Sequence, residues 1–171
     1  MQSRVLMLVV VAAAVTAIAC GSSSDTTGTP VSKIVTFKAT MNAAGEVPSN
    51  TSTGSGTFTA TLDTASNVFT YDVTFTGLTS PVNNGHIHGP SLATATAGTT
   101  INFNTLAGAT FSFGATSGTA HGTTTLNTAT QITATMSGDS LKKLLFAGLT
   151  YANIHTTTNP GGEIRGQITK Q

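Results

Sequence analysis

TFTATLDTASNVFTYDVTF, residues 57–75, consists of two runs of alternating apolar and polar side chains joined by a turn. The first run, 57–62, alternates threonine with Phe, Ala and Leu, and the second, 69–75, resumes the same period of two after the turn residues 63–67. Side chains two apart on a β-strand share one face, so each run has one buried and one wet face. The stretch therefore predicts two neighbouring antiparallel strands.

The same pattern extends in both directions along the chain. Residues 35–41 alternate Val, Phe, Ala and Met with polar residues, which predicts a third long strand beside the first two. Shorter apolar or threonine-rich runs follow at Ile101 with Phe103, at Phe111 with Phe113, at 119–126 and at 131–136. Residues 149–155 and 163–169 predict a terminal hairpin, because Asn159-Pro160-Gly161-Gly162 between them supplies turn residues.

A single segment has helical spacing. Leu141, Leu144 and Leu145 follow Asp139 or Ser140, either of which is a candidate N-cap. Gly148 suits the left-handed position that ends a helix. About seven to nine short strands and this segment predict an all-β fold, an antiparallel β-sandwich or flattened Greek-key barrel with one short helix.

The amino-terminal residues predict export. The apolar run from Val5 to Ile18 matches the core of a signal peptide and is shorter than the roughly 20 apolar residues of a membrane-spanning helix. It ends in Ala19-Cys20, the small residue and cysteine at which lipoprotein signal peptides are cleaved and lipidated. A plain signal peptide cut nearby is the alternative. We expect a signal peptide at 1–19, lipidated Cys20 and a flexible tether at 20–32, and one domain at 33–171, held outside the cytoplasm in the periplasm or at the cell surface.

Charge and motifs exclude several classes of function. Without Arg4, the six remaining basic residues balance six acidic ones, so the mature chain has no basic face for nucleic acid. The single cysteine forms no internal disulfide, so an apolar core must hold the domain. No nucleophile motif, paired carboxylates or phosphate loop is present. We therefore expect a binding or structural protein more than an enzyme.

Histidines are the candidate ligands for chemistry. His86 and His88 lie two apart in Gly85-His86-Ile87-His88-Gly89, so on a strand both rings project to one side and can converge on a metal ion. Hydrogen bonds from these rings to loop backbone are the alternative. His121 is a further candidate ligand, although its place between Ala120 and Gly122 favours a surface or edge position.

The terminal hairpin supplies a third histidine. Tyr151, Asn153 and His155 share one face of their strand, and one register of the hairpin sets Asn153 and His155 opposite Glu163 and Arg165. A Glu-Arg pair between strands is usually structural. We expect Asn153, Glu163 and Arg165 to orient a histidine, as the groups around metal ligands do.

Four stretches together resemble the CHRD domain, the module first described in chordin and also found in bacterial secreted proteins. They are Glu46-Val47-Pro48, His86-Ile87-His88-Gly89-Pro90, Tyr151 to Thr156, and Gly161 to Gln167. The resemblance runs from about Ile34 to Ile168. It implies a binding or structural module of unknown partner.

A weaker resemblance is to copper/zinc superoxide dismutase, an antiparallel sandwich in which a His-x-His strand and a late histidine bind copper. It implies His86, His88 and His155 as ligands, with His121 as a fourth. A full two-metal site needs more histidines than the four present and a cysteine pair that this chain lacks. A single-metal site remains, since neutral imidazole suits copper and zinc.

Two functions are therefore expected. The first is a non-catalytic binding or envelope-structural module, anchored to the membrane by its lipid, with a protein or glycan partner. The alternative is a mononuclear copper- or zinc-binding protein that uses His86, His88 and His155.

Overall fold

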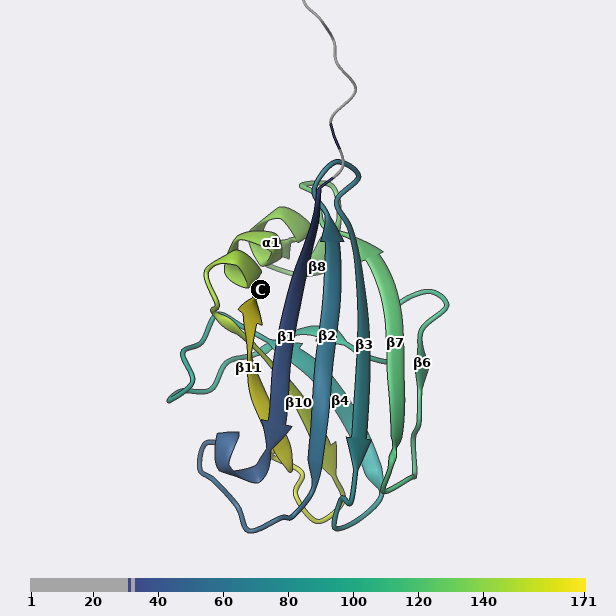
Figure 1. The fold of residues 1–171 in the computed structure, drawn as a ribbon, viewed down its shortest axis with the longest axis vertical. Helices are drawn as coiled ribbons and strands as arrows, with labels where there is room; N and C mark the ends of the chain where they lie inside the picture. The colour runs from purple at the N-terminus through teal and green to yellow at the C-terminus, as the bar shows by residue number, and fades with distance from the viewer. Residues whose placement is uncertain (1–30, 32) are drawn as a thin grey trace, which may run out of the picture.

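The computed structural model describes residue 31 and residues 33–171, so the expected signal peptide, Cys20 and nearly all of the tether lie outside the described residues. Nine of the described strands form one antiparallel sheet (Figure 1). These strands are β1 (Ile34–Asn42), β2 (Ser55–Asp63), β3 (Val68–Thr76), β4 (Val82–His88), β5 (Thr99–Asn102), β6 (Thr110–Phe111), β7 (Gly118–Thr125), β10 (Thr150–Thr156) and β11 (Ile164–Lys170). The strands β8 (Gln131–Thr133) and β9 (Met136–Ser137) pair separately, and a 3₁₀ turn, Ala43–Gly45, follows β1.

The sheet has the strand order β5-β4-β10-β11-β1-β2-β3-β7-β6 and curls over itself. In Figure 1, β1, β2, β3 and β7 stand in front, and β4 and β10 cross behind them. β5 and β6 are the two edges, so the sheet does not close into a barrel. The predicted all-β fold is confirmed, as are the neighbouring strands β1, β2 and β3 and the terminal hairpin of β10 and β11.

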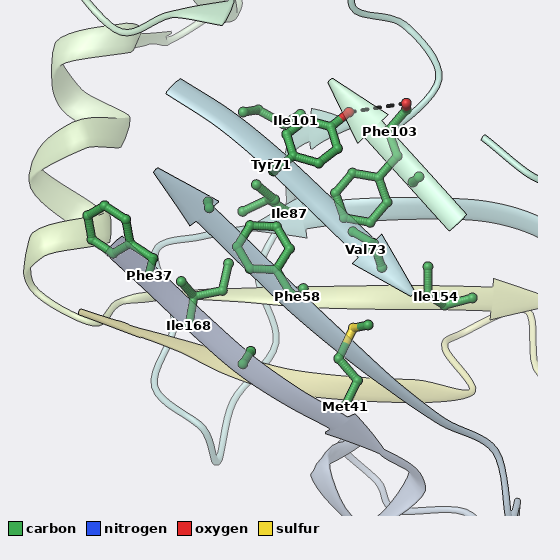
Figure 2. Packing of buried hydrophobic residues seen from close by; sticks show 14 of the residues in the cluster. Phe37, Met41, Phe58, Tyr71, Val73, Ile87, Ile101, Phe103, Ile154 and Ile168 are labelled. Atoms are coloured by element: carbon green, nitrogen blue, oxygen red, sulfur yellow. Dashed lines mark hydrogen bonds between the residues drawn. The ribbon is translucent and has the colours of Figure 1, made fainter. Parts of the chain in front are cut away.

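The core fills the space between the two halves of the curled sheet. Phe58 and Tyr71 from the front half meet Phe103, whose ring centroid lies 5.1 Å from that of Tyr71 (Figure 2). Ile87 and Ile154, from β4 and β10, close the core from the other side. The hydroxyl of Tyr71 donates to the carbonyl of Phe103 at 3.2 Å, so the one polar atom of this cluster is paired.

A glycine makes room for this tyrosine. A Cβ atom at Gly122 on β7 would lie 2.4 Å from the hydroxyl oxygen of Tyr71, closer than real side-chain atoms approach. The register pairs Tyr71 with Gly122, so the phenol ring occupies the space that a side chain on β7 would fill.

Threonines cover the outer face of the front half. The hydroxyls of Thr57 and Thr74 lie 2.8 Å apart across β2 and β3, and those of Thr70 and Thr123 lie 2.9 Å apart across β3 and β7. Cross-strand hydroxyl pairs of this kind give a sheet a polar outer face without charge. On this face threonine therefore provides the polar surface.

The helix α1 (Gly138–Phe146) begins one turn earlier than its leucines suggest. Its N-cap is Ser137, whose hydroxyl accepts from the backbone N–H of Ser140 at 3.3 Å. The predicted caps Asp139 and Ser140 are therefore wrong, because both already lie inside the first turn. Gly148 has the predicted left-handed backbone, with φ of 66°. Within residues 33–171, neither α1 nor any other helix has the length and hydropathy to cross a membrane.

Candidate metal centre

The candidate site lies on the outward face of the β4-β10-β11 half of the sheet. On β4, Ile87 points into the core, so His86 and His88 point to the opposite side. On β10, Ala152 and Ile154 point into the core in the same way. The opposite face of β10 carries Tyr151, Asn153 and His155. All of these residues are buried, so this polar face is covered by protein rather than by water.

The three histidines converge. Nδ1 of His86 lies 3.1 Å from Nε2 of His155, and the ring centroid of His88 lies 5.2 Å from that of His86 and 5.9 Å from that of His155. One nitrogen of each ring can be chosen so that all three lie within 4.8 Å of one another. Two nitrogens on one tetrahedral zinc ion, at about 2.0–2.1 Å each, lie about 3.4 Å apart. The rings must therefore approach one another by up to about 1.4 Å for all three to bind one ion.

Backbone carbonyls fix two of the three tautomers. Nδ1 of His88 faces the carbonyl of Ala97 at 3.0 Å, and Nδ1 of His155 faces the carbonyl of Pro160 at 3.0 Å. A carbonyl only accepts, so both Nδ1 atoms carry the hydrogen and both Nε2 atoms keep a lone pair. Nε2 of His88 is buried without a hydrogen-bond partner. An unpaired acceptor in the interior is costly, and a metal ion would pair it.

His86 completes the set. Its Nδ1–H donates to Nε2 of His155, since that nitrogen holds a lone pair. An ion would replace this hydrogen bond, and His86 would then carry its hydrogen on Nε2. The change is a shift of tautomer and requires no net loss of a proton.

Burial keeps the rings neutral. It lowers the pKa of His86 and of His88 to about 4, with the neighbouring histidines adding to the effect. At His88 the carbonyl of Ala97 acts in the opposite direction. Burial also lowers the pKa of His155, although the carbonyl of Pro160 opposes the shift. All three imidazoles are therefore uncharged at neutral pH, the form that binds a metal.

A loop, residues 91–98, covers this polar face, and we call it the cover loop. Arg165 on β11 is 2% exposed and holds the loop, because its guanidinium donates to the carbonyls of Leu92, Ala93 and Ala95 at 3.2, 3.4 and 2.7 Å. The carbonyl of Ala97, in the same loop, fixes His88. Arg165 thus acts on the histidines through the loop.

Tyr151 joins the same assembly. Its ring stacks on that of His88 with centroids 4.7 Å apart and planes 6° from parallel, and the guanidinium carbon of Arg165 lies 3.5 Å from its centroid. Its hydroxyl oxygen accepts from the N–H of Ala97 at 3.2 Å. The stack limits the ring of His88 to one orientation.

A buried acid lies at the edge of the site. Burial raises the pKa of Glu46 to about 7, while the charge of Arg165 and a hydrogen bond from Asn153 oppose the shift. One carboxyl oxygen of Glu46 and the side-chain oxygen of Asn153 are buried without partners. Asn153 pairs in register with His86 on one side and with Arg165 on the other, so it lies between the histidines and the acid.

Glu163 and His121 lie elsewhere. The carboxylate of Glu163 accepts from side chains and backbone of the turns around it, and within the described residues no imidazole donates to it: its partners are Ser52, Thr79, Thr156 and Asn159. Burial alone would raise its pKa, but the hydrogen bonds from Ser52, Thr156 and Thr79 lower it. Glu163 therefore fixes the turns. His121 lies on β7, 47% exposed, 2.8 Å from Asp72 and apart from the other three histidines.

Sequence reasoning missed Glu46 and the cover loop as parts of the site. Glu46 belongs to a stretch that carries the family resemblance, and that was its one signal. The cover loop consists of Ser, Leu, Thr, Ala and Gly, and it contributes backbone carbonyls that every sequence has. The residue types of the loop therefore do not predict its contacts with Arg165 and His88.

Comparison with known proteins identifies the family of this chain. The family model of the CHRD domain matches residues 37–168, so the chain belongs to the CHRD domain family. The match contains all of the site residues described above. No curated protein and no solved structure shows a significant match to the chain.

Proposed function

We propose that this CHRD-domain protein binds one copper or zinc ion through His86, His88 and His155. The observation that carries the proposal is the set of three buried imidazoles, with two Nε2 lone pairs held inward by the carbonyls of Ala97 and Pro160. Nitrogen ligands of this kind suit copper and zinc better than magnesium or calcium, which prefer oxygen.

The role is binding rather than catalysis, and the place is outside the cytoplasm. The sequence motif around Cys20 supports a lipid anchor in the membrane, with residues 20–32 as the tether. An exported module that holds a copper or zinc ion can store or handle that ion outside the cytoplasm.

Calorimetry with the full chain carrying Cys20→Ala tests the metal site, since this change removes the one thiol that could compete for copper. We expect one zinc or copper(II) ion per chain with a dissociation constant below about a micromolar. His86→Ala and His155→Ala should each abolish stoichiometric binding, because two imidazoles remain.

His121→Ala is the matched control. It removes an imidazole that lies outside the cluster, so binding should be unchanged. Circular dichroism on each variant shows whether the fold survives. The proposal is wrong if the chain binds no ion, or if folded His86→Ala and His155→Ala bind as well as the parent.

A further inference from the structure

The three histidines leave a coordination position open. Copper and zinc in proteins take four ligands in most sites, and a site with three protein ligands keeps the fourth for water or a small molecule. Among the described residues, the cluster contains no fourth histidine and no cysteine, aspartate or glutamate. The fourth ligand must therefore come from outside this set.

A cavity leads to the site. His86 and His155 line a cavity of about 320 Å³ together with Asn83, Asn84 and Pro160. His88 does not line it, and its ring is bonded to the carbonyl of Ala97 in the cover loop. A small molecule can therefore approach the ion from the side of His86 and His155.

Charge favours an anion at this position. Three neutral imidazoles leave both positive charges of a divalent ion uncompensated, and a buried charge without a counter-charge is unfavourable. No acidic side chain lines the part of the cavity that the structure describes. Arg165 adds positive charge nearby, part of which Glu46 offsets from beyond Asn153. The side-chain amides of Asn83 and Asn84 can donate hydrogen bonds to an anion in the cavity.

We infer that the loaded site takes one small anion as its fourth ligand, and that the anion enters through the cavity lined by Asn83, Asn84 and Pro160. This inference rests on the proposed metal site. The fourth coordination position is then exchangeable, so molecules in solution can reach the metal ion and the ion can be released.

Azide is the probe. The copper(II)-loaded chain carrying Cys20→Ala is titrated with azide and followed by absorption and electron paramagnetic resonance, with the copper content measured after desalting. We expect saturable 1:1 binding, a new azide-to-copper absorption band, a changed resonance spectrum and full retention of copper.

Asn84→Asp tests the route of entry. The side-chain oxygen of Asn84 accepts from the backbone N–H of Gly85 at 3.0 Å, and aspartate keeps that acceptor while adding a negative charge in the cavity. We expect azide binding to weaken at least tenfold. Thr59→Asp, on the exposed outer face of β2, is the control and should leave azide binding unchanged.

The outcomes separate the two proposals. A chain that binds neither copper nor zinc overturns both the metal site and the anion position. A chain that binds one copper ion but shows no spectral change with azide, or loses its copper to azide, overturns only the anion position. Azide binding that Asn84→Asp leaves unchanged overturns the route through the cavity.

Discussion

Arg165 links the cover loop to the aromatic stack of Tyr151 and His88. Its guanidinium donates to three carbonyls of the cover loop and lies on the ring of Tyr151, which in turn stacks on His88. Arginine suits this position because its Nη2 group donates to the loop carbonyls while the planar face of the guanidinium rests on an aromatic ring. The charge of Arg165 also lowers the pKa of Glu46, against the larger effect of burial.

Arg165→Gln should destabilise the chain by about 1–3 kcal/mol, because it removes the hydrogen bonds that hold the cover loop and the packing of the guanidinium on Tyr151. Urea unfolding of the metal-free chain measures the change. Zinc affinity should fall as well, since His88 loses the loop that fixes it. Lys170→Gln is the control: its ammonium lies 5.4 Å from the ring of Phe146 on an exposed position, and we expect less than about 0.5 kcal/mol.

Gly122 shows how tightly one residue is specified by its neighbour. Gly122→Ala forces a methyl group against the hydroxyl of Tyr71 and should cost about 1–3 kcal/mol of stability. Gly161→Ala provides the comparison, because nothing lies within 4 Å of its added Cβ, and its thermal midpoint should match that of the parent. Equal midpoints for the two variants would contradict the packing described around Tyr71.

At the scale of elements, the cap of α1 decides where the helix begins. Ser137→Ala removes the acceptor for the N–H of Ser140 and should cost about 1 kcal/mol. Ser140→Ala keeps that backbone hydrogen bond and removes only a hydroxyl contact of 3.2 Å, so its effect should be smaller. Chemical unfolding of both variants gives the order, and a larger loss for Ser140→Ala would restore the cap predicted from sequence.

The elements differ in how well sequence alone predicts them. β1, β2, β3 and the terminal hairpin follow from a period of two, because apolar burial on one face is a local property of each strand. The same period placed His86, His88 and His155 on one side of their strands. Their meeting depends on β4 pairing with β10, a contact between residues 69 apart that no local pattern encodes. The cover loop acts through backbone carbonyls, which every residue has, so the sequence does not show which of them will contact the site. The role of Glu163 in the turns depends on the tertiary positions of Ser52 and Thr79.

At the scale of the whole molecule, the curled sheet buries residues on both of its faces, and the two buried regions differ in chemistry. Its inner face encloses an aromatic and aliphatic core. The outward face of β4, β10 and β11 holds polar and ionisable groups and is covered by loops, except at the cavity beside His86 and His155. The first supplies most of the folding free energy by burial of apolar surface. The second holds unpaired acceptors and neutral histidines, and it makes stability depend on pH.

Acid should destabilise the metal-free chain. In the folded chain the pKa of His86 and of His88 is about 4, below the value of 6.5 for an exposed histidine. Between these values the unfolded chain binds more protons than the folded chain, so the free energy of unfolding falls as the pH falls. Each such group contributes up to about 1.4 kcal/mol per pH unit. Urea unfolding at several pH values from 7 to 4, with a chelator present, should show a loss of a few kcal/mol.

Glu46 works in the opposite direction. Because its pKa is raised to about 7 in the folded chain, it holds a proton there that the carboxyl of the unfolded chain has released above pH 4.5, which stabilises the fold as the pH falls from 7. Glu46→Gln removes this opposing contribution, so its stability should fall more steeply between pH 7 and 5 than that of the parent chain. His86→Ala removes one of the buried imidazoles and should make the dependence shallower. The same slope in all three proteins would show that these buried groups do not govern the acid response.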